Sequence, residues 1–200
     1  MVSTVLLLGG NGYLGKELTR QWHELDPSAQ FVILSRSGRS SMNMEGVTNI
    51  AVNVTDFSAV KSVIPAQVDY VVDLIGRPEK DAFKSVRVND IPAQVMQQIA
   101  EQYGAHVMGF IGGKLGPKAF LQTKDKLIRQ LQTSSVPLAY VEPTLVYGAG
   151  RRDSMTKMVP LLKFLGLFVH NMRPVKIETV IADLLNQLLA YGAAEKIDEN

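Results

Sequence analysis

The feature that most restricts the fold is a run of glycines placed directly behind an apolar segment. Val2–Leu8 is rich in valine and leucine, and it continues into Gly9, Gly10, Gly12 and Gly15. A short, unbroken apolar run is typical of a strand in a parallel sheet that is covered on both faces. Glycines then permit a tight turn and a close approach of the helix that follows. We therefore expect strand, glycine turn and helix, in that order, at the start of the chain.

Short apolar runs and segments of helical periodicity alternate along the rest of the chain. Further strands are predicted at residues 31–34, 49–54, 68–75, 106–111, 138–141 and 175–177. Apolar residues at helical spacing predict helices within residues 14–25, 91–103, 127–131 and 180–188. This alternation indicates βαβ units built around a parallel sheet. The predicted fold is α/β, a Rossmann-type doubly wound sheet in a single domain over residues 1–200, with a small C-terminal substrate-side lobe at about 148–175.

The composition excludes several classes of site. A net charge of +2 provides no strongly basic surface for nucleic acid. The chain has no cysteine, which excludes disulfides, thiolate nucleophiles and cysteine-ligated zinc. His23, His106 and His170 are scattered along the chain, and we predict no metal site from them.

The same composition bears on the compartment. No apolar stretch reaches the ~18 residues that a membrane-spanning helix needs. The apolar N-terminal run lacks the basic residues that precede a secretory signal. We therefore expect a soluble, cytoplasmic protein, in which the lack of disulfides is ordinary.

The glycine turn satisfies two spacings together, Gly9-x-x-Gly12-x-x-Gly15 and Gly10-x-Gly12-x-x-Gly15. In this arrangement the backbone approaches a pyrophosphate closely, and the amides and positive dipole end of the helix face it. Strand, turn and helix occur in the order that a dinucleotide site requires. We predict contacts from the whole turn, including Asn11, Tyr13 and Leu14, against the alternative of a glycine-rich turn without a ligand.

The end of the second predicted strand bears on the choice of cofactor. An acidic residue there suits the ribose hydroxyl of NAD, whereas a cation suits the 2′-phosphate of NADP. The chain has Ser35, Arg36 and Ser37 at this point, and its next acid is Glu45. Arg36 can pair with a phosphate through two hydrogen bonds. NADP is therefore the preferred prediction, and NAD is the alternative if Arg36 is only a solvated surface residue.

Further motifs follow the glycine turn in a fixed order. They are Asn53–Asp56, Val72–Gly76, Val88–Asn89, Thr123–Lys124 and Val141–Gly148. Together with the turn, they resemble the short-chain dehydrogenase/reductase superfamily, in its extended and atypical, epimerase-like or NmrA-like branch. Leu74–Arg77 is particularly similar to relatives of the nucleotide-binding accessory subunit of respiratory complex I.

The resemblance implies roles for individual positions. Asn53 and Val54 would flank the adenine, and Asp56 would cap the helix after them. The ribose and pyrophosphate would lie against Leu74, Ile75 and Gly76. The nicotinamide would lie against Pro143 and Thr144, and Lys124 would hold its ribose unless it is a surface lysine.

Two departures from the family pattern affect catalysis. The family uses a Tyr-x-x-x-Lys pair and an upstream serine, but here Phe120 precedes Lys124 and the serine region is Gly112–Lys114. Phenylalanine exchanges no proton, so the tyrosine-dependent step cannot run. Lys124 and Tyr147 are the remaining catalytic candidates; Tyr147 would supply a replacement hydroxyl, or would be a packing residue in the loop after the sixth strand. Asp73 is either a buried acid of raised pKa or a hydrogen-bonded structural acid.

An apolar segment near the C-terminus suggests a hydrophobic partner. Met158–Val169 is dominated by apolar residues and follows Arg151 and Arg152. It would form a hydrophobic substrate mouth, a face between copies of the chain, or a peripheral membrane contact serving a quinone, unless it is buried core. The chain is shorter than most extended relatives, which argues against a standard sugar-nucleotide epimerase.

Three functional interpretations remain open. In the first, the chain is an NADP(H)-preferring oxidoreductase that reduces a quinone-like or other hydrophobic acceptor without the tyrosine and serine. In the second, it is a non-catalytic nucleotide-binding redox sensor or assembly factor. In the third, a residue such as Tyr147 has taken over proton transfer in carbonyl reduction.

Overall fold

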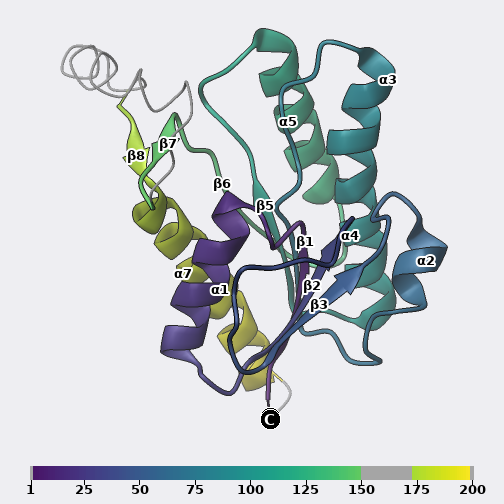
Figure 1. Cartoon of the computed structure of the whole chain (residues 1–200), viewed down its shortest axis with the longest axis vertical. Helices are drawn as coiled ribbons and strands as arrows, with labels where there is room; N and C mark the ends of the chain where they lie inside the picture. The colour runs from purple at the N-terminus through teal and green to yellow at the C-terminus, as the bar shows by residue number, and fades with distance from the viewer. Residues whose placement is uncertain (1, 150–172, 199–200) are drawn as a thin grey trace.

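The computed structural model in Figure 1 describes residues 2–149 and 173–198. Its centre is a sheet of six parallel strands in the order β3-β2-β1-β4-β5-β6. The strands are β1 (Thr4–Leu8), β2 (Gln30–Ser35), β3 (Val47–Ala51), β4 (Tyr70–Asp73), β5 (Val107–Ile111) and β6 (Leu138–Val141). This order confirms the predicted Rossmann-type doubly wound sheet. The order reverses between β1 and β4, which opens a crevice at the carboxyl ends of these strands.

Helices cover both faces of the sheet (Figure 1). On one face lie α1 (Tyr13–Leu25) and α7 (Ile177–Asp198), and on the other α2 (Phe57–Lys61), α4 (Ile91–Tyr103) and α5 (Lys118–Leu131). Successive residues of a strand point to opposite faces, so Val5 and Leu7 of β1 pack with α1 and α7, while Leu6 and Leu8 pack with α4 and α5. The unbroken apolar strands follow from these two cores.

The helix before α4 starts earlier than the sequence predicts. A helix was predicted within residues 91–103, but helical structure begins at α3 (Ala82–Ser85) and continues through the π-helical turn η1 (Val86–Asp90), which contains the motif Val88–Asn89, into α4. Asp81 caps α3, because its carboxylate accepts a hydrogen bond from the Lys84 amide. The predicted cap of α2 is confirmed, since Asp56 accepts from the Ala59 amide at 3.0 Å. π-Helical turns often occur at functional sites.

The region after β6 contains a second, two-stranded parallel sheet. It pairs β7 (Val146–Tyr147) with β8 (Val175–Lys176), so Tyr147 lies in a strand and not in a loop as predicted. The predicted strand at 175–177 ends one residue early, because Ile177 begins α7. The apolar segment Met158–Val169, with Arg151 and Arg152, lies outside the described residues. The interpretations of that segment therefore stay predictions.

The described residues show neither a membrane-spanning helix nor a cluster of metal-ligating side chains. None of the helices in this part of the chain combines the length and apolar character that crossing a bilayer requires. Over the same residues, no three or more His, Asp or Glu side chains come together as they would around a metal ion.

Candidate functional site

Two adjoining cavities lie at the carboxyl ends of the central strands. The larger has a volume of about 460 Å³ and the smaller about 210 Å³, and Ile75 and Gly76 line both. The larger is lined by Gly9, Asn11, Gly12, Ser35, Arg36, Asn53, Val54, Thr55, Ile75, Gly76, Arg77, Lys84, Arg87, Val88 and Pro92. The smaller includes Tyr13, Leu14, Leu74, Phe120, Lys124, Pro143 and Thr144 among its lining residues. An elongated ligand can therefore extend from one cavity into the other along the β4 end.

Two glycines of the turn line the larger cavity, and two others let α1 pack closely against the turn. Gly9 adopts a φ of +77° and its carbonyl accepts the Gly12 amide at 2.9 Å, which makes the turn tight. Gly9 and Gly12 line the larger cavity. Gly12 is the N-cap residue of α1, and no side chain forms a capping hydrogen bond there. Gly10 and Gly15 line neither of the two cavities. They bring α1 onto the turn instead, since a Cβ on Gly15 would lie 2.3 Å from the Gly10 carbonyl oxygen.

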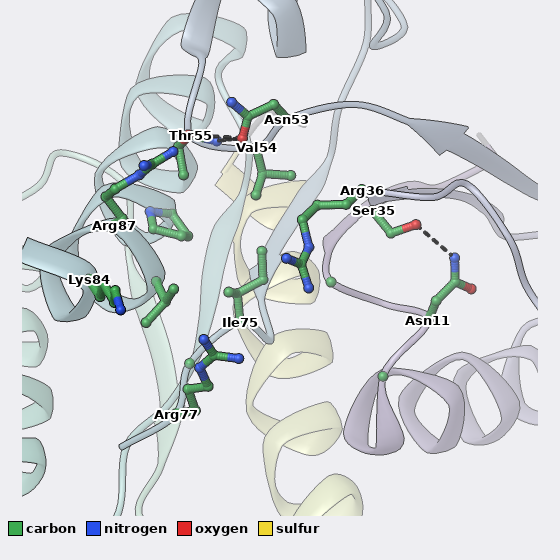
Figure 2. A pocket seen from close by; sticks show the side chains of 15 residues that line it. Asn11, Ser35, Arg36, Asn53, Val54, Thr55, Ile75, Arg77, Lys84 and Arg87 are labelled. Carbon is green, nitrogen blue, oxygen red and sulfur yellow. Dashed lines mark hydrogen bonds between the residues drawn. The ribbon is translucent and has the colours of Figure 1, made fainter. Parts of the chain in front are cut away.

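The larger cavity has a cationic lining. Arg36, Arg77, Lys84 and Arg87 line it, and none of the lining residues in the described part of the chain carries a carboxylate. Figure 2 shows Arg36 and Arg77 directed toward the space around Ile75, with Lys84 and Arg87 contributed by the helix on the far wall. Arg36 is exposed, as its alternative interpretation required, but it nevertheless lines the cavity. This lining suits an anionic ligand.

Sequence reasoning missed three of these four cations. Lys84 and Arg87 lie on the segment α3–η1, whose residues 82–87 are mostly exposed and show no apolar stripe. Arg77 directly follows Leu74–Gly76, which were predicted to contact the ribose and pyrophosphate. This adjacency in the sequence was the one signal that could have identified Arg77 as a site residue. Ser35 also lines the cavity, and its hydroxyl accepts a hydrogen bond from the Asn11 amide nitrogen at 3.2 Å (Figure 2).

The predicted adenine residues lie together on one wall of the larger cavity. The Asn53 carboxamide oxygen accepts hydrogen bonds from the Thr55 amide at 3.2 Å and the Thr55 hydroxyl at 2.9 Å. Val54 is nearly buried beside them, with 6% of its surface exposed. Asn53 is thus held by its own turn, whose carbonyl at Asn53 also accepts the Asp56 amide at 3.0 Å, and Val54 adds apolar surface to this wall.

Asn89 fixes the loop that separates the two cavities. Its side-chain oxygen accepts from the Arg77 amide at 3.0 Å, and its nitrogen donates to the Arg77 carbonyl at 3.1 Å and the Ser85 carbonyl at 3.2 Å. Asn89 is buried, so these bonds are shielded from water. Gly76 adopts a φ of +152°, and a Cβ there would lie 2.8 Å from Lys124 Nζ. The loop therefore needs a glycine at Gly76 and a hydrogen-bonding clamp at Asn89.

The smaller cavity brings together Phe120 and Lys124, the two positions that match the Tyr-x-x-x-Lys spacing of the resemblance. Phe120 and Lys124 both line it from α5, and Gly112 and Gly113 line it at the predicted serine region. Lys124 is 4% exposed, which excludes the surface-lysine interpretation. The cavity therefore has a buried ammonium group and an aromatic ring where relatives have an ammonium and a phenol.

The hydroxyl groups of this cavity are already engaged. Tyr13 donates to the Gly148 carbonyl at 3.0 Å, and the Thr144 hydroxyl donates to the Arg173 carbonyl. They are the hydroxyl-bearing residues of the lining, and Tyr147 belongs to neither cavity's lining. Among the described residues, the lining thus offers no unengaged hydroxyl group, and a catalytic role for Tyr147 stays a prediction.

Lys124 shares its buried surroundings with Asp73 at the end of β4. Burial raises the pKa of Asp73 to about 7, against the opposing effects of Lys124 and of a hydrogen bond from the Ile75 amide. Burial also lowers the pKa of Lys124, and the Asp73 carboxylate opposes that shift. Both predicted descriptions of Asp73, the acid of raised pKa and the hydrogen-bonded acid, therefore apply.

Comparisons with known proteins agree with this geometry. The sequence profile of the NAD dependent epimerase/dehydratase family matches residues 5–124, which include the glycine turn, the cationic lining and Lys124. A search of curated proteins gives no significant match.

Solved structures share the fold at low sequence identity. The Bordetella bronchiseptica enzyme WbmH in complex with NAD+ superposes with a TM-score of 0.72 at 12% identity, over 94% of this chain and 72% of that one. The epimerase Mth375 from Methanothermobacter thermautotrophicus gives 0.73 at 15% identity, over 94% and 68%. ElxO with NADP bound gives 0.69 at 15% identity, over 94% and 92%. At these identities the likeness establishes a common fold.

Proposed function

The chain belongs to the NAD dependent epimerase/dehydratase family, and we propose that it is an NADP(H)-preferring oxidoreductase of an atypical kind. When bound, the dihydronicotinamide supplies a hydride, and the acceptor is a quinone-like or other hydrophobic molecule that needs no tyrosine acid. The proposal rests on one observation above all. In the described part of the chain, the larger cavity joins a glycine turn without a side-chain cap to four cationic side chains and to no carboxylate.

The glycine turn and the cations would bind different anionic groups of the cofactor. Gly9 and Gly12 present backbone to the pyrophosphate at the positive end of α1, where a side chain would intervene. Ser35 ends β2 and Arg36 directly follows it, where a 2′-phosphate is recognised in folds of this order. Lys84 and Arg87 add positive charge from the α3–η1 segment on the opposite wall, and Arg77, which pairs with Glu79 at 3.7 Å, adds to it from the loop after β4. A cavity without carboxylates favours NADP over NAD, because no acid is placed to accept the ribose hydroxyl.

The smaller cavity would hold the nicotinamide end. Lys124 orients the ribose, Pro143 and Thr144 lie beside the ring, and Phe120 with Leu74 keeps water away. These residues bind and orient the reactants and supply no hydroxyl proton, so the protein would act by positioning and electrostatics. The phenylalanine at 120 also argues against the sugar-nucleotide chemistry that a tyrosine performs in relatives.

The lack of an unengaged hydroxyl group among the described lining residues favours one alternative function. A nucleotide site without a hydroxyl acid also suits a non-catalytic redox sensor or assembly factor, in which bound NADP(H) changes the protein and no acceptor is reduced. The two proposals share the binding site and differ only in turnover.

The test combines binding and turnover on the full chain. NADPH is titrated by nicotinamide fluorescence, and its oxidation is then followed with a water-soluble quinone and with a panel of aldehydes and ketones. Quinone-dependent oxidation supports the oxidoreductase, and binding without any turnover supports the sensor. Carbonyl reduction that disappears in Tyr147→Phe would instead favour the third interpretation. Absence of nucleotide binding would contradict all three.

A further inference from the structure

Asp73 is a buried carboxyl group that the proposed function does not use. It is the last residue of β4, it is 1% exposed, and it lies in register between Leu8 of β1 and Phe110 of β5. One oxygen accepts a hydrogen bond from the Ile75 amide at 2.9 Å. The other oxygen is buried and has no hydrogen-bond partner among the described residues. An ionised carboxylate in this position is costly unless a cation compensates it.

Lys124 is the cation that can compensate the Asp73 carboxylate. It is buried, it lines the smaller cavity, and its Nζ lies 4.2 Å from the centre of the Phe110 ring, next to Asp73 in the sheet. Burial raises the pKa of Asp73 to about 7 and lowers that of Lys124, and each group partly opposes the shift of the other. Two such groups exchange protons as a pair.

The other charged groups near the pair are engaged elsewhere. Lys126 of α5 pairs with Asp90 of η1 at 3.1 Å, and Arg77 pairs with Glu79 at 3.7 Å. Glu142, after β6, packs against Gly112, and η1 otherwise turns the neutral Asn89 toward the loop. Among the described residues, Lys124 is the charged group that affects the ionisation of Asp73, and Asp73 is the one that affects Lys124.

We propose that Asp73 is a positioning residue that forms one proton-exchanging unit with Lys124, and that this unit responds to the redox state of the nucleotide. The inference rests on the proposed function, because it places the nicotinamide ring in the cavity that Lys124 lines. The ring carries a positive charge in NADP+ and none in NADPH. The unit carries a net charge of +1 when both groups are protonated and is neutral after it loses one proton. NADP+ therefore binds better to the neutral unit, whereas NADPH discriminates less between the two.

This coupling makes a signed prediction about binding. The ratio of the NADP+ to the NADPH dissociation constant is high at acid pH and falls as the pH rises through about 7. Loss of one proton limits the slope to about tenfold per pH unit. The 2′-phosphate also titrates near pH 6, but it is present in both nucleotides and cancels in the ratio.

The test measures both dissociation constants by calorimetry between pH 6 and 8, on the wild type and three variants. We expect the ratio to fall at least about fivefold in the wild type and to stay flat in the double variant Asp73→Asn/Lys124→Met. Asp90→Asn/Lys126→Met removes the neighbouring ion pair between η1 and α5, which lines neither cavity, and should keep the wild-type slope. Lys124→Met alone should move the change to higher pH, because the Asp73 carboxylate loses its cation.

The outcomes separate this inference from the proposed function. If neither nucleotide binds, the proposed function fails and this inference fails with it. If both bind with a ratio that is flat in the wild type, or equally steep in the folded double variant, only the inference is overturned. Should the double variant not fold, the wild-type slope and the Lys124→Met shift decide.

Discussion

On α5, Phe120 lies one helical turn before Lys124, and the Lys124 Nζ is 5.8 Å from the centre of the Phe120 ring. In the resemblance drawn from the sequence, Phe120 takes the position of a tyrosine and Gly112–Lys114 the region of a serine. The described lining of the smaller cavity keeps the Lys124 ammonium beside apolar walls. We therefore expect the chemistry of this cavity to change when hydroxyl groups are added at these positions.

Phe120→Tyr should create carbonyl reductase activity. A positioned acid accelerates proton transfer by about 10²–10⁴-fold, so NADPH-dependent reduction of an aldehyde should rise by at least about 10²-fold. Gly113→Ser can be added, because a Cβ on Gly113 would have its nearest neighbour, Leu121, at 3.8 Å. Phe120→Leu is the matched control and should show no gain. Equal aldehyde rates in the tyrosine and leucine variants, with NADPH still bound, would refute this account of the missing hydroxyl.

Arg36→Ala should weaken NADPH more than NADH. Hydrogen bonds to a charged group contribute about 1.5–3 kcal/mol, which corresponds to roughly 10–100-fold in the NADPH dissociation constant. Arg39→Ala is the control, since Arg39 lies in the same loop but lines neither cavity. Fluorescence titrations of both nucleotides decide the matter. Equal weakening of NADPH and NADH would show that Arg36 does not select the cofactor.

Gly15→Ala should destabilise the fold. The new Cβ would lie 2.3 Å from the Gly10 carbonyl oxygen and 2.4 Å from the Gly10 Cα, and backbone atoms cannot move aside as a flexible side chain can. Overpacking of this kind costs about 1–3 kcal/mol, occasionally more. Urea denaturation followed by circular dichroism measures the loss. Gly113→Ala, which has space for a methyl group, should change the unfolding free energy much less. If the two variants are equally stable, the close packing of α1 on the turn is wrong.

Asp73 should make stability depend on pH. Its pKa is 3.8 in the unfolded chain and about 7 in the folded one, because burial penalises the charged form. The folded state thus holds the proton more tightly, and this contribution is fully present below about pH 4 and is lost as the pH rises through about 7. Relative to the wild type, Asp73→Asn should gain about 1–4 kcal/mol of unfolding free energy between pH 5 and pH 8. Urea denaturation at both pH values checks this. An identical difference between the two proteins at both pH values would contradict it.

The sequence predicted those parts of the fold that local pattern determines. The β1 strand, the glycine turn and α1 follow one another within a short span, and their residue types leave few alternatives. Strand order was accessible as well, because apolar strands alternating with helices have few ways to pack. The Phe120 and Lys124 pair was found through the family resemblance, because these two positions match its Tyr-x-x-x-Lys spacing, and α5 places both on one helix face.

Other parts of the site could not be predicted because they depend on contacts across the chain. The segment α3–η1 exposes most of its residues, including Phe83, which is 85% exposed. Because it has no apolar stripe, its sequence does not indicate a helix, and its cations Lys84 and Arg87 were not predicted as site residues. The burial of Lys124 depends on Phe110 and Asp73, which lie on different strands, and a lysine directly before Asp125 and Lys126 gives no local sign of it. Tyr147 was misplaced because two-residue strands such as β7 are too short to show a pattern.

The central claim is that the glycine turn and the cations around it bind NADP(H). The most direct measurement is an equilibrium titration of NADPH by nicotinamide fluorescence, with the wild-type chain and Gly12→Ala compared in parallel. A methyl group at Gly12 would face the cavity and lie 3.2 Å from the Gly9 carbonyl oxygen, where the pyrophosphate is expected to approach. We predict saturable binding of one NADPH per wild-type chain, weakened at least about tenfold in the variant. A folded wild-type chain that binds none of NADPH, NADP+, NADH and NAD+ would contradict the account.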